Sequence, residues 1–217
     1  MSQIQNGKIA GAWEDKLTED YISQWGELML HKKIPELCEL LPSDVVLDIG
    51  CGSGAAVRAI AKYLTTGQVT GIDPTTKMIE IANALTANEN LVQNVRFFNA
   101  GAERIPVDDA SCDVVLAVNA LHHWVEVNSG LCEVLRILKP SGRFVSIDDL
   151  WEESIEYQQE SGGNNDDSNC NYELKTVNGI IQLFNNVGFS NISSYENREP
   201  DATASVITGY KEPKFKY

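Results

Sequence analysis

The chain has 217 residues, of which 43% are hydrophobic and 22% charged, a composition typical of one globular domain with a well-buried core. Its 31 acidic and 17 basic residues give a net charge of −14, which disfavours nucleic acids and anionic membrane surfaces as partners. No apolar run reaches membrane-spanning length and the N-terminus is polar, so we expect neither membrane insertion nor a secretory signal.

The cysteines predict a reducing compartment. Their number, five, is odd, and none of them forms a CxxC pair. Cys51 and Cys112 fall within apolar segments, where a thiol behaves as a small buried side chain. We therefore expect a cytoplasmic location without a disulfide framework, and no metal site, since three scattered histidines add no ligand cluster.

The first 42 residues are predicted to form a helical cap on the domain. Apolar side chains recur at helical spacing between Leu17 and Leu41. Pro35 favours the first turn of a second helix, because the N–H group that proline lacks is not needed there.

Residues 43–150 are predicted to be a cofactor-binding core. An apolar strand at Val45–Ile49 runs directly into a glycine-rich turn at Gly50–Gly54. The helix that follows carries Val57 and Ile60 on one face. A strand, a glycine loop and a helix in this order present backbone N–H groups to a nucleotide-like ligand.

The next strand, at 68–72, ends on an acid. Asp73 lies nineteen residues after Gly54, which places its carboxylate at the carboxyl edge of the neighbouring strand. There it can accept hydrogen bonds from two vicinal ribose hydroxyls. Aspartate is also a good N-cap for the following helix, and the two roles are compatible.

Strands and helices continue to alternate after Asp73. The pattern predicts helices at 75–87, 125–138 and from Val177 to a C-terminal glycine at Gly188, and strands at 94–100, 112–119 and 143–148. This order implies a parallel sheet with right-handed crossovers. Residues 151–175 break the pattern and are predicted to be a lid or loop: a plain loop at 161–169 and a lid at 150–157.

Two cofactor classes use such a unit. Dinucleotides favour G-x-G-x-x-G, and here Gly50, Gly52 and Gly54 are followed by Ala55 in the sixth position, which is tolerated. Asp48 argues for the other class, because a carboxylate inside the strand would repel a pyrophosphate. It suits a ligand that carries an ammonium and a sulfonium group, such as S-adenosylmethionine.

Six segments occur in a characteristic order: Val46–Gly54, Gly71–Pro74 with Met78, Ala102–Pro106, Ser111–Val115, Asn119–Trp124 and Leu138–Arg143. Together they resemble the motifs of class I S-adenosylmethionine-dependent methyltransferases, in the small-molecule branch that includes ubiquinone- and menaquinone-type enzymes. The resemblance covers roughly residues 40–150. It implies an α/β, Rossmann-like fold with a seven-stranded, mostly parallel sheet, helices on both faces and an antiparallel hairpin in the C-terminal part, residues 176–217.

The resemblance also implies a cofactor site built from Asp48, Gly50, Cys51, Gly52, Gly54, Asp73, Pro74, Met78, Ala102, Glu103 and Asn119. Asp48 and the glycine loop would hold the methionine end, Asp73 the ribose, and Asn119 would lie under the sulfonium. Met78 and Glu103 would lie at the adenine, although Met78 also fits a plain core position and Glu103 a solvated loop. One position departs from the family, because Gly101 stands where an aspartate usually accepts from the adenine amino group.

Methyl transfer needs no general base when the acceptor is already a nucleophile, so the catalytic residues stay open. The candidates are His122, His123 and Asp148, with Asp149 beside them. Adjacent histidines point in different directions, so at most one is expected to face the cleft. Trp124 fits either a substrate pocket or packing beneath a helix.

The sequence thus predicts a single methyltransferase domain over residues 1–217. It would transfer a methyl group from S-adenosylmethionine to a small-molecule acceptor and release S-adenosylhomocysteine. The expected acceptor wall is Trp13, Tyr21 and Trp25 together with residues 150–157. The alternatives are a non-catalytic adenosylmethionine-binding partner subunit and a nicotinamide-dependent oxidoreductase. These patterns specify neither the acceptor nor the oligomeric state.

Overall fold

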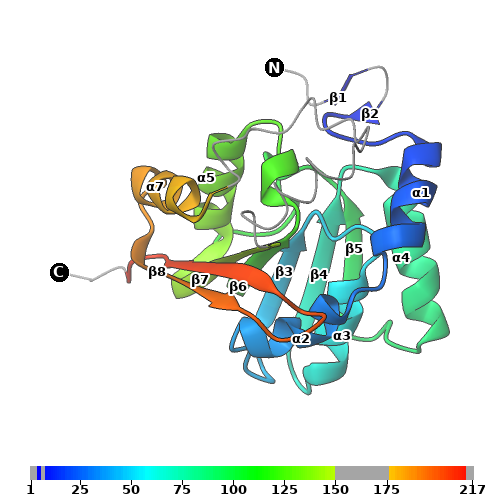
Figure 1. Cartoon of the computed structure of the whole chain (residues 1–217), viewed down its shortest axis with the longest axis horizontal. Helices are drawn as coiled ribbons and strands as arrows, with labels where there is room; N and C mark the ends of the chain where they lie inside the picture. The colour runs from blue at the N-terminus through cyan, green and yellow to red at the C-terminus, as the bar shows by residue number, and fades with distance from the viewer. Residues whose placement is uncertain (1–3, 6–7, 150–175, 214–217) are drawn as a thin grey trace.

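The sheet has the seven strands and the topology that the sequence predicts (Figure 1). The computed structural model describes residues 4–5, 8–149 and 176–213. The strands lie in the order β5-β4-β3-β6-β7-β9-β8. The pairs from β5 to β7 are parallel, and β9 runs antiparallel to both of its neighbours. The strands are β3 (Val45–Ile49), β4 (Gln68–Asp73), β5 (Val95–Asn99), β6 (Cys112–Val118), β7 (Leu138–Asp148), β8 (Ser190–Asn197) and β9 (Ala204–Tyr210).

Helices cover both faces of the sheet, as expected for an alternating α/β chain. They are α1 (Asp15–Trp25), α2 (Met29–Leu37), α3 (Ala55–Tyr63), α4 (Thr76–Asn88), α5 (Val127–Ile137) and α7 (Val177–Val187), with a 3₁₀ turn at Leu121–His123. The α2 and α3 side chains share one buried core with one face of the sheet, and those of α5 and α7 share a second core with the other face. Gly188 ends α7 with φ 105°, as predicted.

The N-terminal segment differs from the predicted cap. It begins with a two-stranded antiparallel ribbon, β1 (Ile4–Gln5) and β2 (Lys8–Ile9), which sequence reasoning did not foresee. The expected helical stretch is two helices, because α1 ends at Gly26 and the N–H of Leu28 is capped by Nδ1 of His31 at 3.1 Å. Pro35 lies in the last turn of α2, not the first, so that prediction is wrong.

A buried arginine ties this segment to the core. Arg58, on α3, has a side chain that is 3% exposed and donates to the carbonyl oxygen of Ser53 at 2.7 Å. It also forms ion pairs with Glu27, in the link between α1 and α2, and with Glu89, at the end of α4. One side chain therefore holds the glycine loop, the N-terminal helices and α4 in a fixed arrangement.

Two other predictions concern the connections. The turn expected at 138–143 belongs to the start of β7, with Ser141 at φ 67°. The lid or loop at 151–175 lies outside the described residues, as does the part of the acceptor wall predicted at 150–157.

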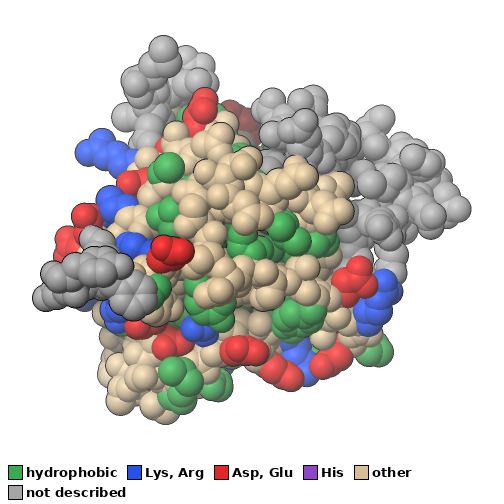
Figure 2. Space-filling view, turned by 90° about the vertical axis from the view of Figure 1, so that its left-hand side faces the viewer, with side chains coloured by type: hydrophobic (Ala, Val, Ile, Leu, Met, Phe, Trp, Pro, Cys, Tyr) green, Lys and Arg blue, Asp and Glu red, His purple; other side chains and the backbone are tan. Residues whose placement is uncertain are grey.

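Charged side chains of both signs lie close together on the molecular surface. Figure 2 shows the face on the α7 and β8 side, where Lys and Arg side chains lie beside Asp and Glu and hydrophobic side chains are scattered. Within the described ranges, none of the helices is long and apolar enough to cross a membrane.

Candidate functional site

A cavity opens at the point in the sheet where the order of the strands reverses. It lies at the carboxyl ends of β3, β4 and β6, with β4 on one side of β3 and β6 on the other. In open α/β sheets such a switch point leaves a crevice that no crossover connection fills. The cavity measures about 960 Å³ including its open mouth, a size suited to a nucleotide-like ligand.

The glycine loop forms one wall of the cavity. Gly50, Cys51 and Gly52 line it, and the N–H groups of Gly50 and Cys51 are anchored on the carbonyl oxygen of Ile72 at 2.8 and 3.0 Å. Gly54 has φ 78° at the start of α3 and lies behind the loop, against Phe97, instead of on the cavity wall. Gly54 thus serves as the turn residue that starts α3, and its predicted contact with the cofactor stays a prediction.

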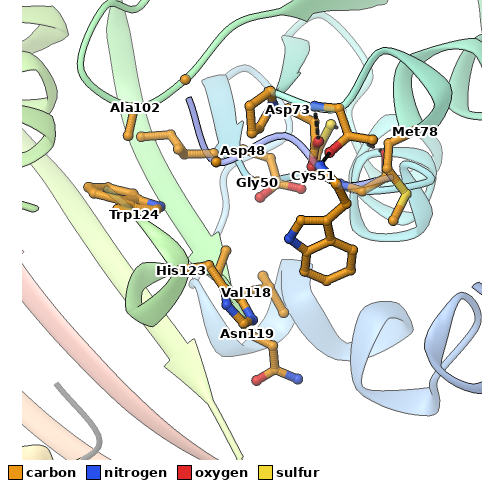
Figure 3. Close-up of a pocket in the computed structure, with 18 of the residues that line it drawn as sticks. Asp48, Gly50, Cys51, Asp73, Met78, Ala102, Val118, Asn119, His123 and Trp124 are labelled. Atoms are coloured by element: carbon orange, nitrogen blue, oxygen red, sulfur yellow. Dashed lines mark hydrogen bonds between the residues drawn. The ribbon is translucent and has the colours of Figure 1, made fainter. Parts of the chain in front are cut away.

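Asp48 brings a buried carboxylate to the cavity. It is 1% exposed and lines the wall beside Gly50 (Figure 3). Its Oδ1 has no hydrogen-bond partner among the described residues. Burial, and then the nearby carboxylate of Asp73, raise the pKa of Asp48 to about 7. An unsatisfied buried carboxylate is costly, and a cationic ligand group would supply what it lacks.

Asp73 closes β4 and holds the loop in place. Its Oδ2 accepts from the N–H of Gly52 at 3.1 Å, and its Oδ1 accepts from the N–H of Thr75 at 2.8 Å. Burial raises the pKa of Asp73, while these two backbone bonds oppose the rise. The turn role and the ligand role are compatible, because each carboxylate oxygen retains a second lone pair.

The expected adenine side of the cavity comes from three segments. Pro74, Met78, Ala102 and Glu103 all line the cavity, and Met78 and Trp124 lie on opposite sides of it (Figure 3). Met78 is 3% exposed, so it is both core and wall.

Glu103 occupies the space that a side chain at Gly101 would take. A Cβ atom built on Gly101 would lie 2.7 Å from Oε2 of Glu103. The other oxygen, Oε1, accepts from the N–H of Glu126 at 3.1 Å. A carboxylate from two residues further along the chain thus occupies the space beside Gly101, and Glu103 is a partly exposed loop residue fixed by a hydrogen bond.

The candidate bases separate into two groups. His123 lines the cavity, as does Asn119, whose φ is 49°. His122 turns the other way, with Nδ1 at 3.2 Å from Oδ1 of Asp148. Asp148 is 2% exposed and its Oδ2 accepts from Ser146 Oγ at 3.0 Å. Neither His122 nor Asp148 lines the cavity, so of the three candidates only His123 lies on its wall.

The predicted aromatic wall is present. Trp13, Tyr21 and Trp25 all line the cavity. Trp124 also lines it, and its buried Nε1 has no partner among the described residues. The Trp124 ring also packs against Phe144, with ring centroids 6.0 Å apart. Trp124 therefore lines the cavity and packs against the core at the same time.

Sequence reasoning missed three polar residues of the wall, Ser53, Thr75 and His31. His31 lines the cavity, and burial, followed by the charge of Arg58, lowers the pKa of His31 to about 4. Its Nδ1 accepts from Leu28, so the neutral ring carries its hydrogen on Nε2 and can donate from there. Its position three residues after Leu28, at a helix start, was the available signal.

The comparisons with known proteins agree with this geometry. The profile of a family described as "Methyltransferase domain" matches residues 47–146. An uncharacterized methyltransferase, YcgJ, of Bacillus subtilis is 40% identical over 103 residues, which are 48% of this chain and 40% of that protein. The 27-O-demethylrifamycin SV methyltransferase of Amycolatopsis mediterranei is 32% identical over 133 residues, 61% of this chain and 47% of that protein. The chain thus spans less than half the length of these two relatives.

The fold is shared more widely than the sequence. A SAM-dependent methyltransferase from Aquifex aeolicus superposes with a TM-score of 0.69 at 19% identity, covering 92% of this chain and 99% of that one. The motifs and the family profile agree that residues 47–146 form a methyltransferase domain, and the strand order and structural likeness show the Rossmann-like fold of S-adenosylmethionine-dependent methyltransferases.

Proposed function

We propose that the chain transfers the methyl group of S-adenosylmethionine to a small-molecule acceptor. The observation that carries this proposal is Asp48, a buried carboxylate on the cavity wall with an unpartnered oxygen. A pyrophosphate would be repelled there, whereas the ammonium group of a methionine moiety satisfies it. The rifamycin-modifying relative acts on a small molecule, which supports an acceptor of that class.

The position of each wall residue indicates which part of the cofactor it would bind. Asp48 and the loop from Gly50 to Gly52 would bind the methionine end, and Asp73 the ribose hydroxyls. Glu103 and Met78 would bind the adenine, and Asn119 lies where the sulfonium is expected. When bound, S-adenosylmethionine supplies an already activated methyl group.

The chain's own contribution is then alignment and exclusion of water. Direct displacement needs the acceptor atom in line with the methyl–sulfur bond, and a fixed cavity supplies that orientation. The acceptor lone pair forms the new bond to carbon, and the electron pair of the broken bond leaves on sulfur. His123 is the candidate that can receive a proton from the acceptor, since it lines the cavity.

Binding measurements with three ligands test the proposal. We expect isothermal titration to show that the purified chain binds S-adenosylmethionine and S-adenosylhomocysteine and does not bind NAD. Tight NAD binding without adenosylmethionine binding would support the oxidoreductase instead. A screen of acceptors with methyl-labelled S-adenosylmethionine tests the other alternative. Cofactor that is bound but never consumed would support the non-catalytic subunit.

Replacing Asp73 tests the ribose assignment. We expect Asp73→Ala to weaken S-adenosylhomocysteine binding at least tenfold, because charge-assisted hydrogen bonds contribute about 1.5–3 kcal/mol. The 2′-deoxy analogue of S-adenosylhomocysteine is the matched probe, since the wild type should bind it more weakly and Asp73→Ala should bind both compounds alike. A preference for the 2′-hydroxyl that survives in Asp73→Ala would remove Asp73 from this role.

We further propose that residues 1–217 act as one methyltransferase unit in a reducing compartment such as the cytoplasm. Cys38, Cys51 and Cys112 are free and buried, an arrangement that suits reduced thiols.

A further inference from the structure

The N-terminal wall of the cavity is an aromatic cluster. Trp13 contacts Tyr21 edge to face, with ring centroids 5.0 Å apart and an angle of 77°. It contacts His123 in the same way, at 5.6 Å and 88°. The backbone N–H of Trp13 donates to Thr75 Oγ1 at 3.0 Å, and this bond fixes the cluster to the start of α4. The electron-rich faces of aromatic rings are a favourable environment for an organic cation.

The charges around the cavity have one sign. Asp48, Asp73 and Glu103 line it, whereas no lysine or arginine of the described ranges does. S-adenosylmethionine brings two positive groups and one carboxylate, so its net charge does not balance three carboxylates. Burial together with the carboxylates of Asp149 and Asp73 raises the pKa of Tyr21 to about 12, which shows that the aromatic cluster also lies in this negative field.

One further carboxylate lies at the rim, beside Asn119. The N–H of Asp149 donates to Oδ1 of Asn119 at 3.1 Å, and Nδ2 of Asn119 lies 3.5 Å from Oδ1 of Asp149. The neighbouring Asp148 is buried and engaged with His122 and Ser146. Asp149 is exposed instead, and its hydrogen bonds with Asn119 place it next to the cavity wall to which Asn119 and His123 belong. The parts of the cofactor assigned above do not require this carboxylate.

We propose that the methyl acceptor is a small amine that carries no phosphate or carboxylate group and enters the site as its ammonium ion, between Trp13, Tyr21 and Asp149. Before methyl transfer one N–H proton passes to His123 on the cavity wall, so that the nitrogen lone pair is free to attack the methyl carbon. This inference rests on the proposed methyl transfer and names the class of its acceptor. An anionic acceptor would meet Asp73, Asp149 and the aromatic ring faces, and no lysine or arginine of the described ranges lines the cavity to receive it. An amine meets a carboxylate at the rim and aromatic rings inside it.

Three compounds of similar shape and different charge test the proposal. The chain is first saturated with S-adenosylhomocysteine and then titrated with 2-phenylethylamine, 2-phenylethanol and phenylacetate. We expect the dissociation constant of the amine to be at least tenfold lower than that of the alcohol or the acid. Equal or tighter binding of the alcohol or the acid, or no saturable binding of the amine, would overturn the proposal.

Variants of the rim separate recognition from general charge. We expect Asp149→Asn to weaken amine binding at least fivefold and to leave alcohol binding unchanged. Asp108→Asn is the matched control and should change neither, because Asp108 is also exposed but is hydrogen-bonded to Ser111 instead of to a residue of the cavity wall. Equal effects of the two variants on the amine would also count against the proposal.

The first titration, with S-adenosylhomocysteine, distinguishes a failure of the proposed function from a failure of the proposed acceptor class. If the chain fails to bind S-adenosylhomocysteine, the proposed function itself fails. If it binds S-adenosylhomocysteine and shows no preference for the amine, only the acceptor class is wrong.

Discussion

Replacing Asp48 by asparagine is expected to stabilise the free protein and, at the same time, to abolish most of its cofactor affinity. The two effects have one cause. Asp48 is buried, its Oδ1 lacks a partner among the described residues, and its pKa is raised to about 7. The carboxylate is unfavourable without a ligand and becomes favourable when a cation arrives.

The sign of the stability effect follows from proton linkage. The pKa of Asp48 is higher in the folded chain than in the unfolded one, so the folded state binds more protons between about pH 4 and pH 7. Its stability therefore falls as pH rises through that window, by at most about 4 kcal/mol for three pKa units. Asparagine avoids this loss but buries an amide that is incompletely hydrogen-bonded, at a cost of about 1–3 kcal/mol. We expect a net gain of about 2 kcal/mol at pH 8, which turns into a net loss of about 2 kcal/mol near pH 4, where only the cost of the buried amide remains.

The binding effect has the opposite direction. Removing one partner of a buried charge pair costs about 2–5 kcal/mol, so Asp48→Asn should weaken S-adenosylmethionine binding roughly 100-fold at pH 8. In the wild type, affinity should rise with pH up to about 7, as Asp48 ionises, and fall again above about 8, where an α-amino group loses its proton. Asp48→Asn should lose the lower limb of this profile.

Urea unfolding and calorimetric titration from pH 5 to 9 measure both effects. Asp108→Asn removes an exposed carboxylate outside the cavity and should change neither quantity. If Asp48→Asn is less stable than the wild type at pH 8, Asp48 is well satisfied in the free protein and the argument fails.

The elements that sequence reasoning placed well are those whose signal is local and strong. β3, its glycine loop and α3 are specified by an apolar run, by glycines at positive φ and by helical spacing within about twenty residues. β4 and Asp73 follow from the same rule. These elements alone bring the predicted carboxylates to one edge of the sheet, which is why most of the cofactor wall was foreseen.

The parts that sequence reasoning missed depend on individual side-chain contacts that apolar periodicity does not report. The second helix was predicted to start near Pro35, whereas it starts at Met29, where His31 caps Leu28. Adjacent histidines look alike in a sequence, and the carboxylate of Asp148 is what draws His122 away from the cavity.

The replacement of a missing carboxylate was left open for a similar reason. A glycine at 101 removes a side chain, and no local rule says what fills its place. Glu103 fills it because the N–H of Glu126, at the start of α5, holds its carboxylate there. Such a substitution across two residues becomes visible only when α5 is packed against the loop.

Gly50→Ala is the other substitution with a large expected effect, and it tests how tightly the glycine loop is packed. Gly50 has φ 75°, and a Cβ built there would lie 2.6 Å from Cβ of Ala120. Strain in this backbone region costs about 1–2 kcal/mol, and overpacking adds about 1–3 kcal/mol. We expect a total loss of about 2–5 kcal/mol in the free energy of unfolding. We also expect at least a tenfold loss of S-adenosylhomocysteine affinity, because the loop must move.

Two further variants separate strain from steric overlap. Gly52 also has a positive φ, 51°, but a Cβ there meets only Met78 Sδ at 3.9 Å, so Gly52→Ala should lose the strain component alone, about 1 kcal/mol. The double variant Gly50→Ala/Ala120→Gly removes the methyl group that Gly50→Ala strikes and should recover about 1–3 kcal/mol relative to additivity. Additive losses in that double-mutant cycle would show that Gly50 is required for its backbone conformation and not for the close approach of β3 to the end of β6.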